Sequence, residues 1–341
     1  YNDKLDVAAR TSWVNYGFLF GGTNDNLEEI KAINPKTTPG LKLFLGSSTG
    51  NMLVDDPNTL KEIFSAFRLP IAVHCEDEQT IMANLAAYVK KFGDDIPIAH
   101  HPDIRSAEAC YLSSSKAIAL AKETGARLHV FHLSTARETT LFQNDVPLAE
   151  KQITAEVCIH HLWFSDEDYA KKGTHIKWNP AVKSAADRAG LWEALNDDRI
   201  DIIATDHAPH TLEEKNQAYI KAPSGGPMVQ HALAVMLECV HQGKISIEKV
   251  VEKMCHNPAI LFAIKERGYI RTGYFADLVL VDKNQAHTIT REGLLYKCGW
   301  SPLEGTTLRG AVTHTFLNGR LMYENGNIKE AHHAKPLSFT R

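Results

Sequence analysis

The sequence contains no long hydrophobic run and no block of basic residues. No apolar stretch approaches the roughly 20 residues that a membrane-spanning helix needs. The 341 residues carry 37 basic and 41 acidic side chains, which gives a formal net charge of -4. A chain with this balance lacks the electrostatic surface that attracts nucleic acid or an anionic membrane. These absences argue against both as main partners and favour a small-molecule substrate.

The cysteines form no paired motif. Six cysteines are scattered through the sequence without any CxxC spacing: Cys75, Cys110, Cys158, Cys239, Cys255 and Cys298. A disulfide framework is not expected at this size and spacing, so we interpret them as reduced, mostly buried thiols of a cytoplasmic protein. No signal peptide is visible, and the sequence opens with Tyr1 instead of Met. We therefore expect that the true N-terminus lies upstream.

Strand-like apolar runs alternate with amphipathic helical stretches, which is typical of βα units around a parallel sheet. The predicted strands are Trp13–Phe20, Leu41–Leu45, Ile71–His74, Leu128–His132, Ile153–Cys158 and Asp201–Thr205. The predicted helices are Asn58–Phe67, Glu78–Phe92, Ala107–Thr124, Ala185–Leu195 and Val229–His241. Further on, short β-like segments separated by Gly and Asn predict a small β appendage: Ala276–Val281, Ala311–Leu317 and Gly319–Tyr323.

These patterns predict an α/β fold in two parts. Residues 1–264 would form the βα part, and residues 265–341 a small β-rich domain with a C-terminal tail. Six strands are too few to close an eight-stranded barrel and would leave a sheet with a free edge. Either the fold is a different open sheet, or about two βα units lie upstream of Tyr1.

Four of the predicted strands carry a side chain of metal-ligand type at or near their ends. The residues are Lys42, His74, His132 and Asp206, the last within Thr205-Asp206-His207-Ala208-Pro209-His210. In a parallel α/β barrel this rim is where the chemistry takes place. Each histidine alone is more often a hydrogen-bonded core residue than a ligand. Together they are credible ligands for zinc or a similar ion, and Asp206 is a candidate ligand and proton acceptor.

Lys42 lies between large apolar neighbours in Gly40-Leu41-Lys42-Leu43-Phe44. Loss of hydration lowers the pKa of a lysine, and a neutral lysine amine can react with carbon dioxide to give a carbamate that bridges two metals. The simpler alternative is a lysine that pairs with an acid at a strand end, as buried charges generally do. The local pattern by itself favours this simpler alternative.

Other residues of the candidate site also have structural interpretations. Asn179 precedes a proline and is explained equally well by turn chemistry. Gly225 closes a loop that begins at Ala208, which is either a surface excursion or a lid that brings backbone amides over a substrate. His100-His101 is predicted to lie on a surface loop. His160-His161 is predicted to contact the metal ligands at most, without binding the metal itself.

Taken together, these residues resemble the amidohydrolase superfamily and, within it, the dihydroorotase family. The resemblance runs from Leu41 to the C-terminus. It is carried by Leu41-Lys42-Leu43-Phe44, Val73-His74-Cys75-Glu76-Asp77, Ile104-Arg105-Ser106, Val130-Phe131-His132-Leu133-Ser134, Glu156 to Leu162, Asn179-Pro180 and Asp206 to His210. Asp206 to His210 is the most discriminating segment, because related hydantoinases and allantoinases generally have no histidine at the position of His210.

The resemblance implies a (β/α)8 TIM barrel of the metal-dependent amidohydrolase type with a small C-terminal β appendage. It implies two divalent metal ions, zinc being expected, bridged by carboxylated Lys42. His74 and His132 would hold one ion, and Asp206 would bind the other and act as the general base. Asn179, His210 and the backbone at Gly225 would bind the substrate.

The reaction implied is the reversible cyclisation of N-carbamoyl-L-aspartate to dihydroorotate in pyrimidine biosynthesis. A homodimer and an aspartate transcarbamoylase partner are compatible with the resemblance. His210 suits a substrate carboxylate, which a hydantoin ring lacks. The alternatives are a hydantoinase, dihydropyrimidinase or allantoinase, and a non-catalytic dihydroorotase-like scaffold.

One part of the family pattern is missing from the sequence. The family's first barrel strand ends in a His-x-His pair and is followed by an arginine that binds the substrate carboxylate. No His-x-His occurs in these 341 residues. We expect both elements to lie upstream of Tyr1, because a degenerate relative has little reason to retain Lys42, His74, His132 and Asp206 together.

Overall fold

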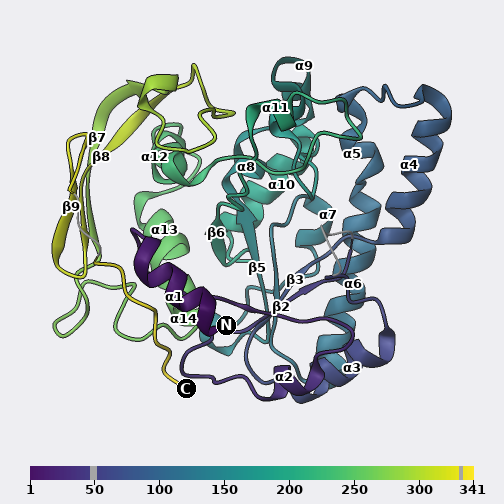
Figure 1. Ribbon diagram of the computed structural model, residues 1–341, viewed down its shortest axis with the longest axis horizontal. Coiled ribbons are helices and arrows are strands. Elements are labelled where there is room, and N and C mark those ends of the chain that lie inside the picture. Colours follow the sequence, from purple (N-terminus) through teal and green to yellow (C-terminus); the bar gives the residue numbers. More distant parts are fainter. Residues whose placement is uncertain (47–51, 330–332) are drawn as a thin grey trace.

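Two β-sheets organise the chain in the computed structural model, which describes residues 1–46, 52–329 and 333–341. One is a six-stranded sheet in the order β1-β2-β3-β4-β5-β6, with every neighbouring pair parallel. The other is a four-stranded antiparallel sheet in the order β10-β9-β8-β7. Figure 1 shows β7, β8 and β9 on the left, and helices α3, α4 and α6 on the right. The predicted α/β class and the β-rich C-terminal sheet are both confirmed.

The parallel strands follow the order of the sequence, and strands 2 to 6 lie within the ranges predicted for them. Their bounds are β1 Phe20–Gly21, β2 Leu41–Phe44, β3 Ile71–His74, β4 Leu128–Val130, β5 Ile153–Cys158 and β6 Ile202–Ala204. In β2 the burial alternates: Leu41 and Leu43 are fully buried in the main apolar cluster, whereas Lys42 and Phe44 are partly exposed. Because side chains alternate along a strand, Lys42 and Phe44 share the face opposite to the apolar pair.

Helices cover the parallel sheet and join its strands. Their bounds are α1 Asn2–Thr11, α2 Leu27–Lys31, α3 Pro57–Ala66, α4 Glu78–Phe92, α5 His101–Ile104, α6 Ala107–Thr124, α7 Ala136–Thr139, α8 Ile159–Trp163, α9 Tyr169–Lys172, α10 Ala185–Asn196, α11 Leu212–Lys215, α12 Ala232–His241, α13 Ile247–Val251 and α14 Asn257–Leu261. The longest ones begin at side-chain caps: Asp77 accepts from the Thr80 amide at α4, and Ser106 from the Ala109 amide at α6. Such caps satisfy amides that have no partner within the helix, and they fix where each helix starts.

The predicted strand Trp13–Phe20 is wrong. Only Phe20–Gly21 pairs with β2, and helix α1 precedes this region. The Tyr16 amide instead donates to the Lys335 carbonyl, and the Leu337 amide donates to the Tyr16 carbonyl. The aromatic, β-prone segment therefore runs beside the C-terminal tail, where it pairs through Tyr16 and leaves Trp13 44% exposed.

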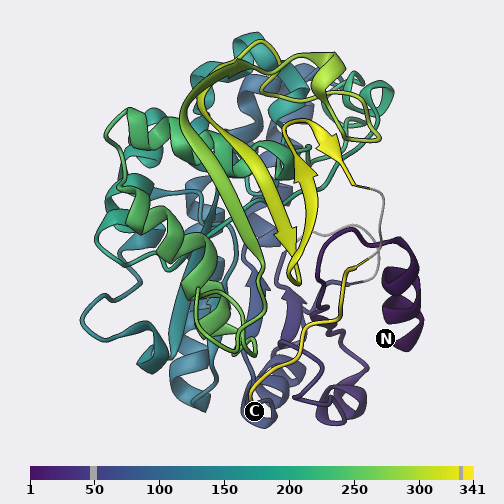
Figure 2. The same cartoon turned by 90° about the vertical axis from the view of Figure 1, so that its left-hand side faces the viewer.

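The antiparallel sheet packs against the parallel part through α12. Its strands are β7 Leu278–Thr288, β8 Thr307–Leu317, β9 Arg320–Glu324 and β10 Asn327–Ile328. Figure 2 shows these strands facing the viewer, with α1 to their right. Glu238 of α12 accepts hydrogen bonds from the Arg309 guanidinium and from the Arg309 backbone amide. Gly310 of β8 lies so close to α12 that a Cβ there would approach the Leu237 Cβ to 2.6 Å.

The six parallel strands leave β1 and β6 as edge strands among the described residues. Closure into an eight-stranded barrel therefore stays a prediction. No helix in the described ranges is both long enough and apolar enough to cross a bilayer. Of the six cysteines, four are buried, Cys298 is partly exposed and Cys255 is exposed, so the prediction that they are mostly buried is confirmed.

Candidate functional site

The ends of β3 and β4 bring two imidazoles together. His74 is the last residue of β3, and His132 follows β4 by two residues in a backbone conformation with φ 39°. His74 Nδ1 lies 3.0 Å from His132 Nε2, and the ring centroids are 4.8 Å apart in an edge-on arrangement. Both side chains are buried, and burial lowers the pKa of both imidazoles, which favours the neutral form that a metal ion accepts.

A buried ion pair supports His74 from its other side. His74 Nε2 lies 3.0 Å from Glu76 Oε2, and the same carboxylate oxygen accepts a hydrogen bond from Arg105. Burial by itself would raise the pKa of Glu76, but Arg105 and His74 outweigh it and hold that pKa at about 2. The fully buried Glu76 is therefore a carboxylate, charge-paired with Arg105.

Lys42 lies among aromatic rings close to both histidines. Its Nζ is 4.7 Å from the centroid of the Phe44 ring and 4.0 Å from that of Phe131. Burial lowers the pKa of Lys42 to about 8, although Glu156 and Asp206 oppose this shift. The electrostatic interactions of Lys42 extend to His74, His132 and Asp206. A larger neutral fraction of this amine is what formation of a carbamate requires.

Asp206 follows β6 by two residues, again with a positive φ, of 43°. Burial and the neighbouring Glu156 raise the pKa of Asp206 to about 6, whereas Lys42 lowers it. The structure thus places His74, His132 and Asp206 at or just after the carboxyl ends of β3, β4 and β6, whereas Lys42 is the second residue of β2. His74 and His132 are in direct contact, and Lys42 interacts electrostatically with the other three residues.

The donor chemistry of this cluster fits a divalent ion. Two neutral imidazole nitrogens face each other, and His132 Nδ1 is buried without a hydrogen-bond partner. Across the described ranges, no group of three or more His, Cys, Asp and Glu side chains is placed to hold a metal ion by itself. A complete ligand set here therefore needs the Lys42 side chain as a carbamate, or ligands from elsewhere. Nitrogen and carboxylate-type oxygen ligands suit zinc and several neighbouring ions.

The residues predicted to bind substrate lie on two connected loops. Asn179 Oδ1 is buried without a hydrogen-bond partner. His210 Nε2 lies 3.2 Å from the Ser224 carbonyl oxygen. Both backbone polar groups of Gly225 are already bonded, since its amide donates to the Lys177 carbonyl and its carbonyl accepts from Lys215. Gly225 has φ +124°, and a Cβ there would approach the Ala208 carbonyl oxygen to 2.5 Å.

A buried lysine holds the loop from Ala208 to Pro227 in place. Lys215 of α11 is fully buried, and its ammonium donates to the carbonyls of Lys177, Pro223 and Gly225. These bonds tie the Gly225 loop to the segment that carries Asn179. The sequence left two interpretations of this loop open, a surface excursion or a lid. The structure adds the hydrogen bonds of Lys215, which connect the loop to itself and to the Lys177 segment.

Sequence reasoning missed several residues near the site. His101 was predicted to lie on a surface loop, which is wrong: it is buried, its Nδ1 lies 3.0 Å from the Tyr219 hydroxyl, and its Nε2 lies 2.7 Å from the Trp178 carbonyl oxygen. Glu76 belongs to the Val73–Asp77 motif, but its ion pair with Arg105 was not predicted. A local sequence pattern does not identify partners that are 29 residues apart. His160 and His161 lie in α8, directly after β5, and both are buried.

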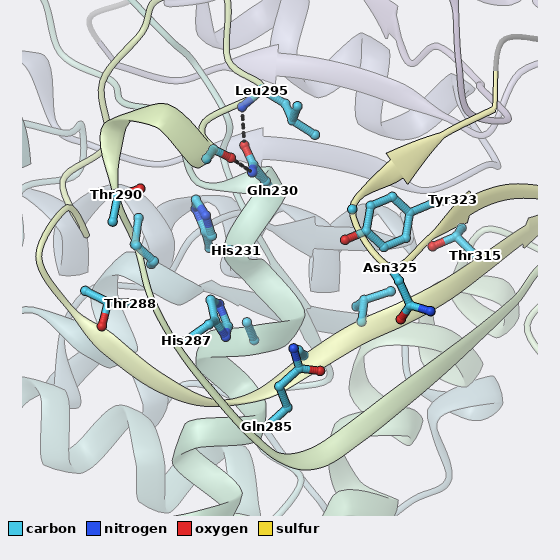
Figure 3. A pocket seen from close by; sticks show the side chains of 16 residues that line it. Gln230, His231, Gln285, His287, Thr288, Thr290, Leu295, Thr315, Tyr323 and Asn325 are labelled. Carbon is cyan, nitrogen blue, oxygen red and sulfur yellow. Dashed lines mark hydrogen bonds between the residues drawn. The ribbon is translucent and has the colours of Figure 1, made fainter.

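A separate pocket of about 580 Å³ lies between the antiparallel sheet and α12, away from the four strand ends. Figure 3 shows His231, which directly precedes α12, and His287 of β7 facing this space. Tyr323 of β9 and Asn325, which follows β9, line the pocket from the other side. Its lining mixes apolar and polar side chains, carries no Lys, Arg, Asp or Glu, and contains none of the predicted ligands. The pocket is therefore distinct from the candidate metal site.

Comparison with known proteins identifies the class. The amidohydrolase family model matches residues 50–322. A dihydroorotase of Halobacterium salinarum is 32% identical over 306 residues, which cover 89% of this chain and 69% of that protein. An allantoinase of Desulfitobacterium hafniense is 30% identical over 335 residues, covering 96% of this chain and 74% of that protein. The L-hydantoinase (dihydropyrimidinase) of Arthrobacter aurescens superimposes with a TM-score of 0.92 at 27% identity, covering 99% of this chain and 76% of that one.

The chain belongs to the amidohydrolase family. Its dihydroorotase, allantoinase and hydantoinase relatives are all hydrolases of cyclic amides, and the chain is therefore a cyclic amidohydrolase. The family resemblance seen in the sequence is thereby confirmed, whereas the choice among the three activities rests on the residues of the site.

Proposed function

We propose that this cyclic amidohydrolase is a dihydroorotase, which interconverts dihydroorotate and N-carbamoyl-L-aspartate in pyrimidine biosynthesis. The observation that carries the proposal is the convergence of His74 and His132 at 3.0 Å, with Lys42 and Asp206 coupled to the same cluster. The dihydroorotase of Halobacterium salinarum supports the choice of activity. His210 supports it independently, because an imidazolium whose Nε2–H donates to the Ser224 carbonyl still offers Nδ1–H to a substrate carboxylate.

In the proposed site, two divalent ions would be held by His74, His132, Asp206 and Lys42 as a carbamate, and we propose zinc. Bound ions of this kind lower the pKa of water towards neutrality and polarise a carbonyl group. Asp206 accepts a proton from the attacking water through its carboxylate. It then delivers that proton to the ring nitrogen as the bond between that nitrogen and the carbonyl carbon breaks.

The substrate is held by the two loops that the buried Lys215 fastens together. Asn179 offers a side-chain amide whose Oδ1 has no other partner, and His210 offers an imidazole at the neighbouring loop. Because the amide and the carbonyl of Gly225 are already bonded, we assign this glycine the role of shaping the loop, and its neighbours would contact the ring.

The test is turnover of dihydroorotate by protein made from its complete coding sequence and loaded with zinc. We expect consumption of dihydroorotate, and a loss of at least about 100-fold in kcat for Asp206→Asn, because general acid–base catalysis typically contributes 100- to 10,000-fold. Circular dichroism checks that the variant is folded. Wild-type turnover that is unchanged by Asp206→Asn would contradict the assigned role.

A second candidate activity is hydrolysis of an uncharged ring by a hydantoinase, dihydropyrimidinase or allantoinase. The TM-score of 0.92 with the L-hydantoinase and the allantoinase relative favour it. The two activities separate on His210. Turnover of an anionic ring that falls in His210→Ala supports the dihydroorotase, whereas turnover of hydantoin or allantoin that this change leaves intact supports the second candidate.

A further inference from the structure

His74 and His132 face each other, but their outer nitrogens have opposite environments. His74 Nε2 meets Glu76 Oε2 at 3.0 Å, whereas His132 Nδ1 is buried without a hydrogen-bond partner. An imidazole that has a fixed acceptor on one nitrogen carries its proton there and presents a lone pair on the other. The two candidate ligands therefore differ in how firmly their tautomers are set.

Glu76 is held as a carboxylate by a second partner, Arg105. Arg105 donates to Glu76 Oε2, and both side chains are buried, with Glu76 fully so. A buried carboxylate with a guanidinium partner can only accept hydrogen bonds. The proton between His74 Nε2 and Glu76 Oε2 therefore belongs to the histidine.

The same reasoning assigns the proton between the two rings. His74 Nδ1 then carries a lone pair, so the 3.0 Å contact with His132 Nε2 is a hydrogen bond only if His132 Nε2 is the donor. Arg105, Glu76, His74 and His132 thus form one ordered chain of donors and acceptors. It ends at His132 Nδ1, which has no partner.

We propose that Glu76 is a positioning residue that fixes His74 as its Nε2–H tautomer and aims His74 Nδ1 at the metal site, while His132 changes tautomer when metal binds. His132 carries its proton on Nε2 in the metal-free protein and on Nδ1 once Nε2 becomes a ligand. The change exchanges one proton with solvent at each nitrogen and releases none overall. The metal part of this inference rests on the proposed function, whereas the assignment of the His74 tautomer does not.

The test reads the tautomers directly. Long-range ¹H–¹⁵N spectra of histidine-labelled protein report which ring nitrogen carries the proton, and His74→Gln and His132→Gln spectra assign the signals. We expect Nε2–H for both rings in metal-free protein. Adding zinc should leave His74 as Nε2–H and move the His132 proton to Nδ1. An Nδ1–H signal for His74 in the metal-free wild type would overturn the inference.

Zinc affinity provides the second measurement, by competition with a chromophoric chelator. Glu76→Gln should weaken zinc binding about 10- to 100-fold, which is the usual cost of losing an outer partner of a histidine ligand. Glu76→Asp keeps the charge near Arg105 but shortens the reach to His74, so it should also weaken binding. If both variants fold and bind zinc as the wild type does, the inference fails.

Glu138→Gln is the matched control. Glu138 is also buried, but it accepts hydrogen bonds from the hydroxyls of Ser114 and Thr135. Its substitution should leave the affinity for zinc and the His74 tautomer unchanged. A wild type that shows the Nε2–H tautomer at His74 but binds no zinc would contradict the proposed function and still support the role of Glu76 in orienting His74.

Discussion

At the scale of single residues, the site depends on buried charges whose partners come from distant parts of the sequence. Arg105 pairs with Glu76, and Lys215 reaches three backbone carbonyls on two loops. A buried charge without such partners costs several kcal/mol, so each of these side chains is tied to one conformation of its surroundings. The chemistry of the site therefore rests on residues that do not react.

Lys215→Met should loosen the loop that carries Gly225. The substitution keeps the apolar stem but leaves the carbonyls of Pro223 and Gly225 without a donor, whereas the Lys177 carbonyl still accepts from the Gly225 amide. We expect a loss of about 2–4 kcal/mol in the free energy of unfolding, since unsatisfied buried acceptors cost about 1–3 kcal/mol. Urea denaturation measures it.

Lys221→Met is the control, because Lys221 lies on the same loop but is exposed. Its free energy of unfolding should stay within about 0.5 kcal/mol of wild type, as for most surface substitutions. Equal losses in the two variants would mean that the contacts of Lys215 do not hold the loop.

The four candidate metal ligands could be predicted from the sequence. Lys42, His74, His132 and Asp206 were proposed as ligands because each stands at or near the end of an apolar, strand-like run. The buried state of His101 could not be anticipated, because its partner Tyr219 is 118 residues away. Local patterns predict which residues end a strand, but they do not identify the distant side chain that shields one of them.

At the scale of elements, local signals determined the long helices well. Helices α4 and α6 span the predicted ranges, since Asp77 and Ser106 cap their starts and Gly93 and Gly125 follow their ends. The prediction of a strand at Trp13–Phe20 was wrong, because the backbone of Tyr16 pairs with the C-terminal tail instead of with the parallel sheet. Composition predicted an extended chain there, but it could not name the partner.

The close contact between α12 and β8 at Gly310 leads us to expect that a side chain there destabilises the protein. Gly310→Ala forces a side chain into a backbone with φ +112° and against Leu237 of α12. The expected loss of stability is about 2–6 kcal/mol, from about 1–3 for the strained backbone and about 1–3 for overpacking. Thermal unfolding measures this loss.

Gly319→Ala separates the two contributions. Gly319 also has a positive φ, of +82°, but no atom lies within 4 Å of a Cβ built there. This variant should show only the backbone cost, about 1–3 kcal/mol. If Gly310→Ala is no more damaging than Gly319→Ala, the close approach of β8 to α12 does not limit stability.

The ion pair between the same two elements should make stability depend on pH. Hydrogen bonds from Arg309 lower the pKa of Glu238 from 4.5 to about 2. Because the pKa is lower in the folded state, the stabilisation is fully present above about pH 4.5 and is lost as the pH falls towards 2. Glu238→Gln should therefore cost about 1–2 kcal/mol at pH 7, given that Arg309 is half exposed, and progressively less below pH 4.5.

Urea denaturation at a series of pH values checks this prediction. Glu304→Gln, at an exposed glutamate, is the control and should follow the wild type at every pH. A difference between wild type and Glu238→Gln that does not shrink with acidification would contradict the assigned ion pair.

At the scale of the whole molecule, a parallel sheet and an antiparallel sheet share α12 as a common support, and the candidate site lies at the carboxyl ends of the parallel strands. That rim is where parallel α/β folds place their reactive groups. The sequence predicted a parallel sheet from the alternation of strand-like and helical stretches, and a β-rich appendage from short β-like segments separated by Gly and Asn. It could not predict that the last residues pack back, with Arg341 donating to the carbonyls of Pro39 and Phe262.

The central claim is that His74, His132, Lys42 and Asp206 form one metal centre. Anomalous X-ray diffraction at the zinc edge, on crystals of the zinc-loaded protein, tests it most directly. We expect one peak within about 2.0–2.1 Å of both His74 Nδ1 and His132 Nε2, the usual zinc–nitrogen distance, and a second peak beside Lys42 and Asp206. Zinc bound elsewhere, with no peak between the two imidazoles, would mean that these four residues do not form a metal centre.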